Sequence, residues 1–420
     1  MYSDVPSTNP EDTTQLWSEV MSQTASKRQP RAKTQQPSTT ESDDGEYLTP
    51  SGVTNEENTA SPYDSDFDEQ VLPAYGMSYL NSKSQDTCLL ELYDLQELDQ
   101  LLESNDEELD EQQRSLKTKF ESLTQLSCLK DQYDCERICR GYQHMIRIKE
   151  LEPAFTTFAL RGIFIGEDVQ ELDPTDERLV PVLLQTCVCK PGPNRLWKIP
   201  QLIGSKPKKP YLWDIRPDCL FAFSPQAFGR FNSKSIEMHV TVLRDVACCA
   251  YLSIIFKKSE ICTAKTARNQ LIVASTIALY NRFLLKCKAR EVMKWSVGDY
   301  RQLRHYGIAI DAASWTLFCT VPKTEEWDKL WYAEPKLCNN DKLPALSWKG
   351  TEMREIASGS CRHLSDTISL LSHLMSVHLW GLYTHAESCR KDIRELSYPN
   401  MALLNKFKGL KLKKGNKDGD

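Results

Sequence analysis

The spacing of hydrophobic residues changes along the chain and divides it into parts of different character. Residues 1–80 have few grouped hydrophobic residues and are rich in Ser, Thr, Pro, Asp, Glu and Asn. A segment of this composition buries too little apolar surface to offset the entropy lost on ordering. We therefore predict a disordered acidic leader of low complexity over 1–80.

Helical spacing begins close to Cys88. Leucines then recur every three to four residues, and the runs EELDEQQRSLKTKFESLTQL and CERICRGYQHMIRIKELE continue the pattern as far as Pro153, a residue that is not tolerated in a helix interior. The heptads are short and irregular, which favours helices over 88–152 that pack on the domain that follows. A partner-binding coiled coil, with a protein partner held by the 88–150 helices, is the alternative.

The part from 153 to 395 alternates or runs continuously apolar between turns rich in Pro, Gly and Lys, which is typical of β-strands. Strands are expected at 157–166, 181–190, 211–223, 236–243, 249–256 and 291–297, and on both sides of the IDAAS turn within 305–321. Helices are expected at 263–288 and 361–392. Strands, a helix and further strands predict an α/β (α+β) domain, in which helices flank a mixed central β-sheet.

The net charge of −6 conceals a division of the chain. Residues 1–111 carry 25 Asp and Glu against 5 Lys and Arg, whereas the remainder carries 33 against 47. A basic body behind an acidic leader suits a polyanion-binding surface that the leader can screen. The alternative is ordinary solvated charge, since disordered leaders are often acidic. The tail at 396–420 is also basic, with the run KFKGLKLKKGNK, and can add phosphate contacts.

Several classes of protein are disfavoured by what the sequence lacks. No apolar run approaches the ~20 residues of a membrane-spanning helix, and the polar N-terminus has the pattern of neither a signal nor a transit peptide. We therefore expect no membrane partner and an intracellular location, in the nucleus or the cytoplasm. The 15 cysteines form no CxxC pair, which predicts reduced thiols rather than a zinc site. Walker A, GxSxG and HExxH motifs do not occur either.

Three polar residues fall on the elements expected around the sheet. Asp218 enters a strand in RPDCLFAF, Lys257 closes the strand AYLSIIFKKS, and Gln270 lies in the first turns of the helix that follows. An acid that enters a buried strand is costly unless something pairs with it. Taken singly, these residues are a turn acid, a solvated strand end and an ordinary helix residue. Their order in the chain favours a shared polar cluster at one edge of the sheet.

The same residues resemble a known family. The dipeptide PD (217–218), a strand that ends in hydrophobic-x-Lys (255–257) and a helix with NQ (269–270) resemble the PD-(D/E)XK nuclease superfamily. Together with the later run RQLRHYGIAIDAASWTLF, they resemble more closely the PD-(D/E)XK nuclease-like domain of uncharacterised fungal proteins. The resemblance spans about residues 90–390, and it implies a restriction-endonuclease-like core over 153–395 that acts on nucleic acid, with DNA favoured.

The family's chemistry implies roles for the three residues. Two carboxylates hold Mg²⁺, and the metal ion sharpens a water nucleophile that hydrolyses a phosphodiester. A lysine positions that water or offsets charge on the phosphate. By this resemblance Asp218 is a metal ligand, Lys257 stabilises charge and Gln270 orients the site.

Ile255 stands where the superfamily has its second carboxylate, and it offers no oxygen to a metal ion. Candidates to replace that ligand are Glu260, which we take as the second metal ligand, Glu237, Asp245, and a helix acid such as Glu136 or Glu150. Two functions follow from this departure. The protein is either a Mg²⁺-dependent nuclease with a weakened site, or an inactive relative that binds nucleic acid or protein.

Overall fold

A mixed sheet of seven strands organises the structure, a computed structural model. It describes residues 59–80, 100–125, 132–164, 181–185, 197–228, 233–243, 247–257, 264–290, 302–323 and 347–397. The strands are β1 (Met77–Leu80), β2 (Pro181–Gln185), β3 (Cys219–Phe223), β4 (Cys248–Lys257), β5 (His305–Asp311), β6 (Ser314–Pro322) and β7 (Thr351–Ser360). Their order in the sheet is β1-β7-β6-β5-β4-β3-β2.

The described helices surround this sheet. They are α2 (Phe67–Gln70), α4 (Glu111–Gln125), α5 (Gln132–Arg147), α6 (Glu152–Gly162), α7 (Ser233–His239), α8 (Ala264–Arg290), α11 (Leu364–Leu379) and α12 (Ala386–Ser397). Short 3₁₀ helices lie at Pro73–Tyr75, Asp106–Glu108 and Pro225–Phe228, and a π-helical turn at Trp380–His385 joins α11 to α12. None of the described helices is both long and apolar enough to span a membrane.

The pairing of the strands positions the candidate site. β1 pairs in parallel with β7, and β4 pairs in parallel with β5, while the other neighbours are antiparallel. Two parallel neighbours need a long crossover, which α8 supplies between β4 and β5. The β4–β5 register sets Lys257 beside Asp311 at the end that the two strands share.

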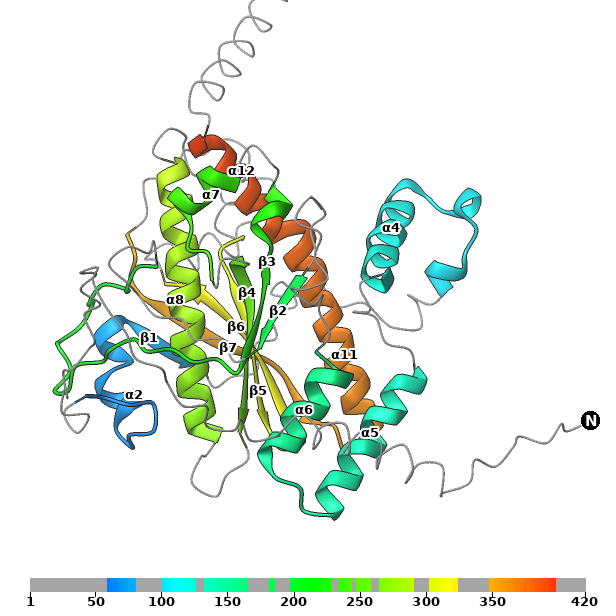
Figure 1. The fold of residues 1–420 in the computed structure, drawn as a ribbon, viewed down its shortest axis with the longest axis horizontal. Coiled ribbons are helices and arrows are strands. Elements are labelled where there is room, and N and C mark those ends of the chain that lie inside the picture. The colour runs from blue at the N-terminus through cyan, green and yellow to red at the C-terminus, as the bar shows by residue number, and fades with distance from the viewer. Residues whose placement is uncertain are drawn as a thin grey trace, which may run out of the picture. The chain divides into compact units, whose positions relative to one another are not determined.

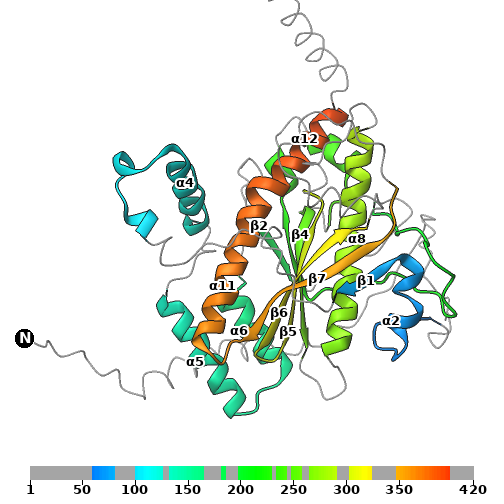
Figure 2. The same ribbon diagram turned by 180° about the vertical axis from the view of Figure 1, so that it is seen from behind.

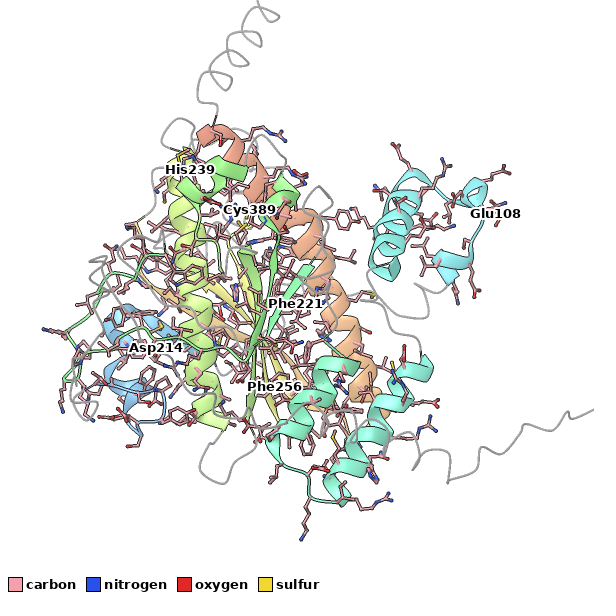
Figure 3. The ribbon with its side chains drawn as sticks, viewed as in Figure 1. Glu108, Asp214, Phe221, His239, Phe256 and Cys389 are labelled. Carbon is pink, nitrogen blue, oxygen red and sulfur yellow. The ribbon has the colours of Figure 1, made fainter. Side chains whose placement is uncertain are left out.

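Helices cover both faces of the sheet. α8 and the segment that carries α2 lie on one face, whereas α5, α6 and α11 lie on the other (Figures 1 and 2). Side chains of a strand alternate between faces, so Ile255 joins the apolar cluster under α8 while Ile254 and Phe256 join the cluster on the opposite face. Phe256 lies beside α6 (Figure 3), where its ring meets Phe164 edge to face at 6.0 Å. The expected mixed sheet flanked by helices is confirmed.

The strand expected at 157–166 is wrong, because most of this segment belongs to α6. Pro153 falls in the first turn, where its missing N–H costs no hydrogen bond. Phe155, Ala159 and Gly162 are the buried residues of α6. Their spacing of four and three is the period of a helix face. The segment TFALRGIF was predicted as a strand because its apolar residues also fit a β-like pattern.

The strand expected at 236–243 is also wrong. Its first half belongs to α7, in which Ile236 is fully buried and its carbonyl accepts a hydrogen bond from the N–H of Val240. Only Leu243 retains β character, as an isolated bridge to Ala247. Glu237 and Met238 are both exposed, which a helical turn allows and the alternation of a half-buried strand does not.

The predicted leader extends too far along the chain. Residues 59–80 contribute α2 and β1 to the fold, with Phe67, Val71 and Leu72 at most 2 % exposed. The prediction missed these grouped hydrophobic residues because it rested on the polar composition of 1–80 as a whole. Residues 1–58 lie outside the described residues, as do the expected strand at 291–297 and the tail at 398–420.

The prediction of other elements is confirmed. β4, α8, the β5–β6 hairpin and the closing α11–α12 run fall where they were expected. The strand expected at 211–223 is shorter than predicted, since β3 begins only at Cys219. The strand expected at 181–190 is described only as far as Gln185. β7 was not expected at all.

A close approach of β5 to α8 leads to the first prediction. A Cβ added at Gly307 would lie 2.8 Å from Cγ and Cδ1 of Leu271. Because overpacking a dense core forces side chains and backbone to shift, we expect Gly307→Ala to lower the free energy of unfolding by about 1–3 kcal/mol. Denaturant unfolding of the full chain measures it.

Gly162→Ala is the matched control, because a Cβ there meets its nearest atom, Cγ1 of Ile138, at 3.7 Å. A distance of 3.7 Å is ordinary van der Waals contact, and alanine is more favourable than glycine in a helix. The control variant should therefore lose no stability. Equal losses for the two variants would contradict the close packing of β5 against α8.

Candidate functional site

Asp218 is held by the backbone of β4. Its N–H donates to the carbonyl of Ile254 at 3.1 Å, and its Oδ2 accepts a hydrogen bond from the N–H of Phe256 at 2.6 Å. These bonds continue the β3–β4 ladder by one residue and place the carboxylate against the end of β4. The position of Asp218 is therefore set by strand pairing.

Lys257 lies next to this carboxylate, as the sequence analysis expected. Its Nζ is 3.9 Å from Asp218 Oδ2, and its side chain is 10 % exposed against 34 % for the aspartate. An ammonium group so far from solvent is costly unless an anion compensates it. The two residues therefore form a partly buried ion pair at the end of β4.

Two further acids, Glu152 and Asp311, lie near the pair. Burial raises the pKa of Asp218, Lys257 and the N–H of Phe256 oppose that rise, and the negative charge of Glu152 adds to it. Burial also raises the pKa of Asp311, again with a contribution from Glu152. Glu152 of α6 thus lies within electrostatic reach of both Asp218 and Asp311, and the β4–β5 register sets Asp311 beside Lys257.

Gln270 contacts a different part of the structure. Its Nε2 donates to the hydroxyl of Tyr63 at 3.2 Å. The neighbouring Asn269 is 1 % exposed, and its Oδ1 accepts a hydrogen bond from the hydroxyl of Tyr79 at 3.1 Å. The NQ dipeptide therefore fastens the segment that carries α2 and β1 onto α8, and an orienting role for Gln270 stays a prediction.

Ile255 is part of the hydrophobic core. It is 0 % exposed and belongs to the apolar cluster under α8, together with Ala267 and Leu271. Cys219 pairs with Ile254 in the β3–β4 register, so extending that register by one residue sets Asp218 opposite Ile255. The position at which the resemblance would place the second acid is therefore occupied by a packed aliphatic side chain.

The described residues do not fit a magnesium site. Mg²⁺ needs near-octahedral oxygen ligation, and no three His, Cys, Asp or Glu side chains in the described ranges are grouped so as to hold a metal ion. The second ligand proposed from the sequence, Glu260, lies outside the described residues, as does Asp245. Glu237 is exposed on α7. The metal role of Asp218 accordingly stays a prediction.

Glu152 was missed by the sequence analysis, which considered Glu136 and Glu150 instead. It is the acid in the first turn of α6, a position where carboxylates are favoured by the helix dipole. The dipeptide EP that opens α6 is the signal that marks it as a helix start. Its proximity to Asp218 depends on how α6 packs on β4, which local sequence does not encode.

A cavity of about 280 Å³ opens beside the site, on the α8 face of the sheet. Its charged lining residues are Asp311, Glu355, Lys265 and Arg268. The guanidinium of Arg268 lies 4.5 Å from the centre of the Tyr79 ring. The cavity therefore joins the end of β5 to the first turns of α8, and it carries charges of both signs.

The histidines of the closing helix pack in the core. Nδ1 of His378 lies 2.7 Å from the hydroxyl of Tyr251, and burial lowers the pKa of His378 to about 3. Nδ1 of His373 lies 2.6 Å from the carbonyl of Ser369, a geometry in which the ring nitrogen donates. These contacts explain both residues without a metal ion.

Compared with protein-family models, with curated proteins and with solved structures, the chain matches none of them. Its class therefore rests on its own geometry. It is an α+β protein in which helices flank a mixed seven-stranded sheet, with a partly buried aspartate–lysine pair where β3 and β4 meet.

The aspartate–lysine pair leads to the second prediction. Lys257→Met removes the charge that opposes the raised pKa of Asp218, so this pKa should rise further. An acid whose pKa is higher in the folded than in the unfolded chain binds more protons when folded, and stability then falls as pH rises through that interval. We expect a loss of about 1–3 kcal/mol near pH 7 and a smaller loss near pH 4, where unfolded Asp begins to protonate.

Denaturant unfolding at the two pH values measures this effect. The double variant Asp218→Asn, Lys257→Met is the control, since an amide can still accept from Phe256 N–H but does not titrate. The stability loss of the double variant should not show the pH dependence that is expected for Lys257→Met. A pH effect of the same size in the single and double variants would show that Asp218 is not the titrating group.

Proposed function

We propose that the chain is a PD-(D/E)XK nuclease-like protein that has lost metal-dependent hydrolysis and binds nucleic acid, with DNA as the favoured partner. The observation that carries this proposal is the fully buried Ile255, which sits in the core opposite Asp218. An acid at this position would have to displace core packing under α8 to reach a metal ion.

The order of the elements supports the nuclease-like scaffold. Asp218 stands at the entry to β3, and Lys257 ends the antiparallel neighbour β4. α8 follows with Asn269 and Gln270 near its start, and the β5–β6 hairpin carries the YGIAID run and Trp315. This is the order in which the motifs occur in the family that the sequence resembles.

The electrostatics of the site support the loss of hydrolysis. A divalent cation needs its carboxylates to point at one place, whereas Asp218 Oδ2 already accepts a hydrogen bond from Phe256 and faces the ammonium of Lys257. The lysine supplies the positive charge that the buried carboxylate requires.

Positive charge at the start of α8 supports nucleic-acid binding. The first turn of α8 contains no acid, and Lys265 and Arg268 lie at the end where the helix dipole is positive. Residues 112–420 carry 47 Lys and Arg against 33 Asp and Glu. Phosphate groups are bound mainly through such charges, and the affinity falls steeply with salt concentration.

Residual hydrolysis is the second candidate function. It is favoured by the two acids near Asp218, since Glu152 and Asp311 bring negative charge to the same end of the sheet. Side-chain rearrangement on substrate binding would be needed to bring these acids together.

One experiment separates the two functions and forms the third prediction. Full-length protein is titrated with labelled duplex DNA in EDTA and in Mg²⁺ or Mn²⁺, and the DNA is then analysed for cleavage. We expect binding without cleavage, independent of the metal ion and at least tenfold weaker at about 200 mM than at about 50 mM salt. Lys265→Gln should weaken binding several-fold, whereas Lys391→Gln, an exposed change on α12, should not.

The other outcomes are equally informative. Metal-dependent cleavage that Asp218→Asn abolishes would establish the second candidate in place of the first. Neither binding nor cleavage, with duplex DNA or single-stranded RNA, would overturn the proposal.

Two aspartates of the segment that carries α2 lie close to lysines, one of which is at the start of α8. These contacts lead to the fourth prediction. Asp68 Oδ1 lies 2.8 Å from Lys265 Nζ, and Asp64 Oδ2 lies 3.9 Å from Lys209 Nζ. Because these carboxylates compete with phosphate for the lysines, Asp68→Asn should strengthen DNA binding about two- to fivefold at low salt, with a smaller effect at high salt.

Glu69→Gln is the matched control, since it removes the same charge from the exposed neighbouring position. Fluorescence anisotropy compares the two variants. An equal gain for both would indicate general repulsion, and no gain for either would contradict screening of the surface by this segment.

A further inference from the structure

A second pocket lies near the other end of β4, far from the aspartate–lysine pair. It measures about 80 Å³ and is lined by residues of α7, α8, the start of β4 and the segment at Trp197. Cys249 of β4 belongs to its lining, eight residues before Lys257, which corresponds to roughly 25 Å along a strand. His239 and Cys389 mark this region, at the end of the molecule where α7, α8 and α12 meet (Figure 3).

Four buried polar atoms around this pocket have neither a hydrogen-bond partner nor an ion-pair partner among the described residues. They are Trp197 Nε1, Thr241 Oγ1, Arg282 Nε and His385 Nδ1. Their residues are at most 9 % exposed, and all four line the pocket. Buried polar atoms that are left unsatisfied are costly, and they are rare in folded proteins. Their concentration around one cavity indicates that a polar ligand in the pocket forms the missing hydrogen bonds.

The charge of the pocket defines the kind of ligand. Arg282, Lys198, Lys288 and His239 are lining residues, and no Asp or Glu is among the described lining residues. Of the four unpartnered atoms, the indole and guanidinium nitrogens carry hydrogens and can only donate, and the hydroxyl can donate as well. A site that binds an anion needs hydrogen-bond donors and cations without a competing carboxylate, and the described lining residues meet these conditions.

The principal cation is already held in place. Nη1 of Arg282 lies 2.6 Å from Asp392 Oδ2, and Nη2 donates to Ser388 Oγ at 2.6 Å. These contacts fix the guanidinium plane through its two terminal nitrogens and leave the Nε–H edge without a partner. A group that is oriented beforehand loses little conformational entropy when it binds.

One wall of the pocket is preorganised too. The side-chain amide of Asn281 accepts a hydrogen bond from the backbone N–H of Lys198 at 2.6 Å and donates to the carbonyl of Lys198 at 2.9 Å. The segment beside Trp197 is thereby fastened to α8. The pocket also exceeds the roughly 10–15 Å³ that one water needs, so an ion of five heavy atoms can enter.

We propose that this pocket binds a tetrahedral oxyanion of the phosphate class. Arg282 is the central ligand, Trp197 and Thr241 donate to the oxygens, and Lys198 and Lys288 provide positive charge at the rim. Nε2 of His385 lies 3.2 Å from the carbonyl of Cys249, where it donates, so Nδ1 of the neutral ring is an acceptor that a hydroxyl of a protonated phosphate can satisfy. The proposal uses neither Lys265 nor Arg268, the two residues named for nucleic-acid binding, so either function can fail without the other.

The fifth prediction tests this site with inorganic phosphate. Isothermal titration of the full-length protein should show one saturable phosphate site that chloride at equal ionic strength does not reproduce. A second titration with a phosphomonoester distinguishes free phosphate from an esterified phosphate group, and saturable binding of either supports the proposal.

Arg282 also holds Asp392, so the main variant avoids it. Thr241→Val keeps the shape of the side chain and removes its hydroxyl, and it should weaken phosphate binding about tenfold. Thr320→Val is the matched control, because Thr320 Oγ1 is also buried without a partner but lies on β6, outside the pocket lining. It should leave phosphate binding unchanged.

Three results would overturn the site. They are the absence of saturable binding of either ligand, an equal effect of chloride, and an equal response of the Thr241 and Thr320 variants.

Discussion

The antiparallel pairing of β3 with β4 sets the position of the candidate site. It carries Asp218 to the end of β4, where the aspartate accepts a hydrogen bond from Phe256 N–H and lies 3.9 Å from Lys257. The same register sets it opposite Ile255, which is buried under α8. A slip of one residue would exchange the two faces of the strand. The ion pair of Asp218 with Lys257 and the burial of Ile255 opposite Asp218 thus both follow from the β3–β4 register.

This constraint places charge at the end of β4, where the described residues form no group that could hold a metal ion. Burial raises the pKa of both Asp218 and Asp311, the negative charge of Glu152 adds to both rises, and Asp311 lies beside Lys257 in the β4–β5 register. In the nuclease superfamily that the sequence resembles, a metal ion balances such charge, whereas here a buried ammonium does so. The charged end of the sheet lies next to the positive end of α8, and the proposed binding of phosphate groups rests on this arrangement.

The sequence predicted the elements whose signals are local and strong. β4 and α8 are long apolar runs, and the β5–β6 hairpin has a clear turn, so each was expected where it occurs. β7 was missed because Arg354 and Glu352 break its apolar pattern, although the two side chains pair with each other at 2.5 Å on one face. The contact of Asp218 with Lys257 followed from motif order. The influence of Glu152 and the attachment of Gln270 to Tyr63 depend on packing between distant segments, which a single sequence does not reveal.

The proposal that the burial of Ile255 prevents a metal site at the end of β4 can be tested with Mn²⁺, a paramagnetic ion with ligand preferences close to those of Mg²⁺. Electron paramagnetic resonance reports the free Mn²⁺ that remains when the ion is titrated into wild-type protein and into Asp218→Asn. If the core position is closed, the two proteins leave equal free signals. One equivalent of Mn²⁺ bound by the wild type and released by Asp218→Asn would contradict the absence of a metal site at the end of β4.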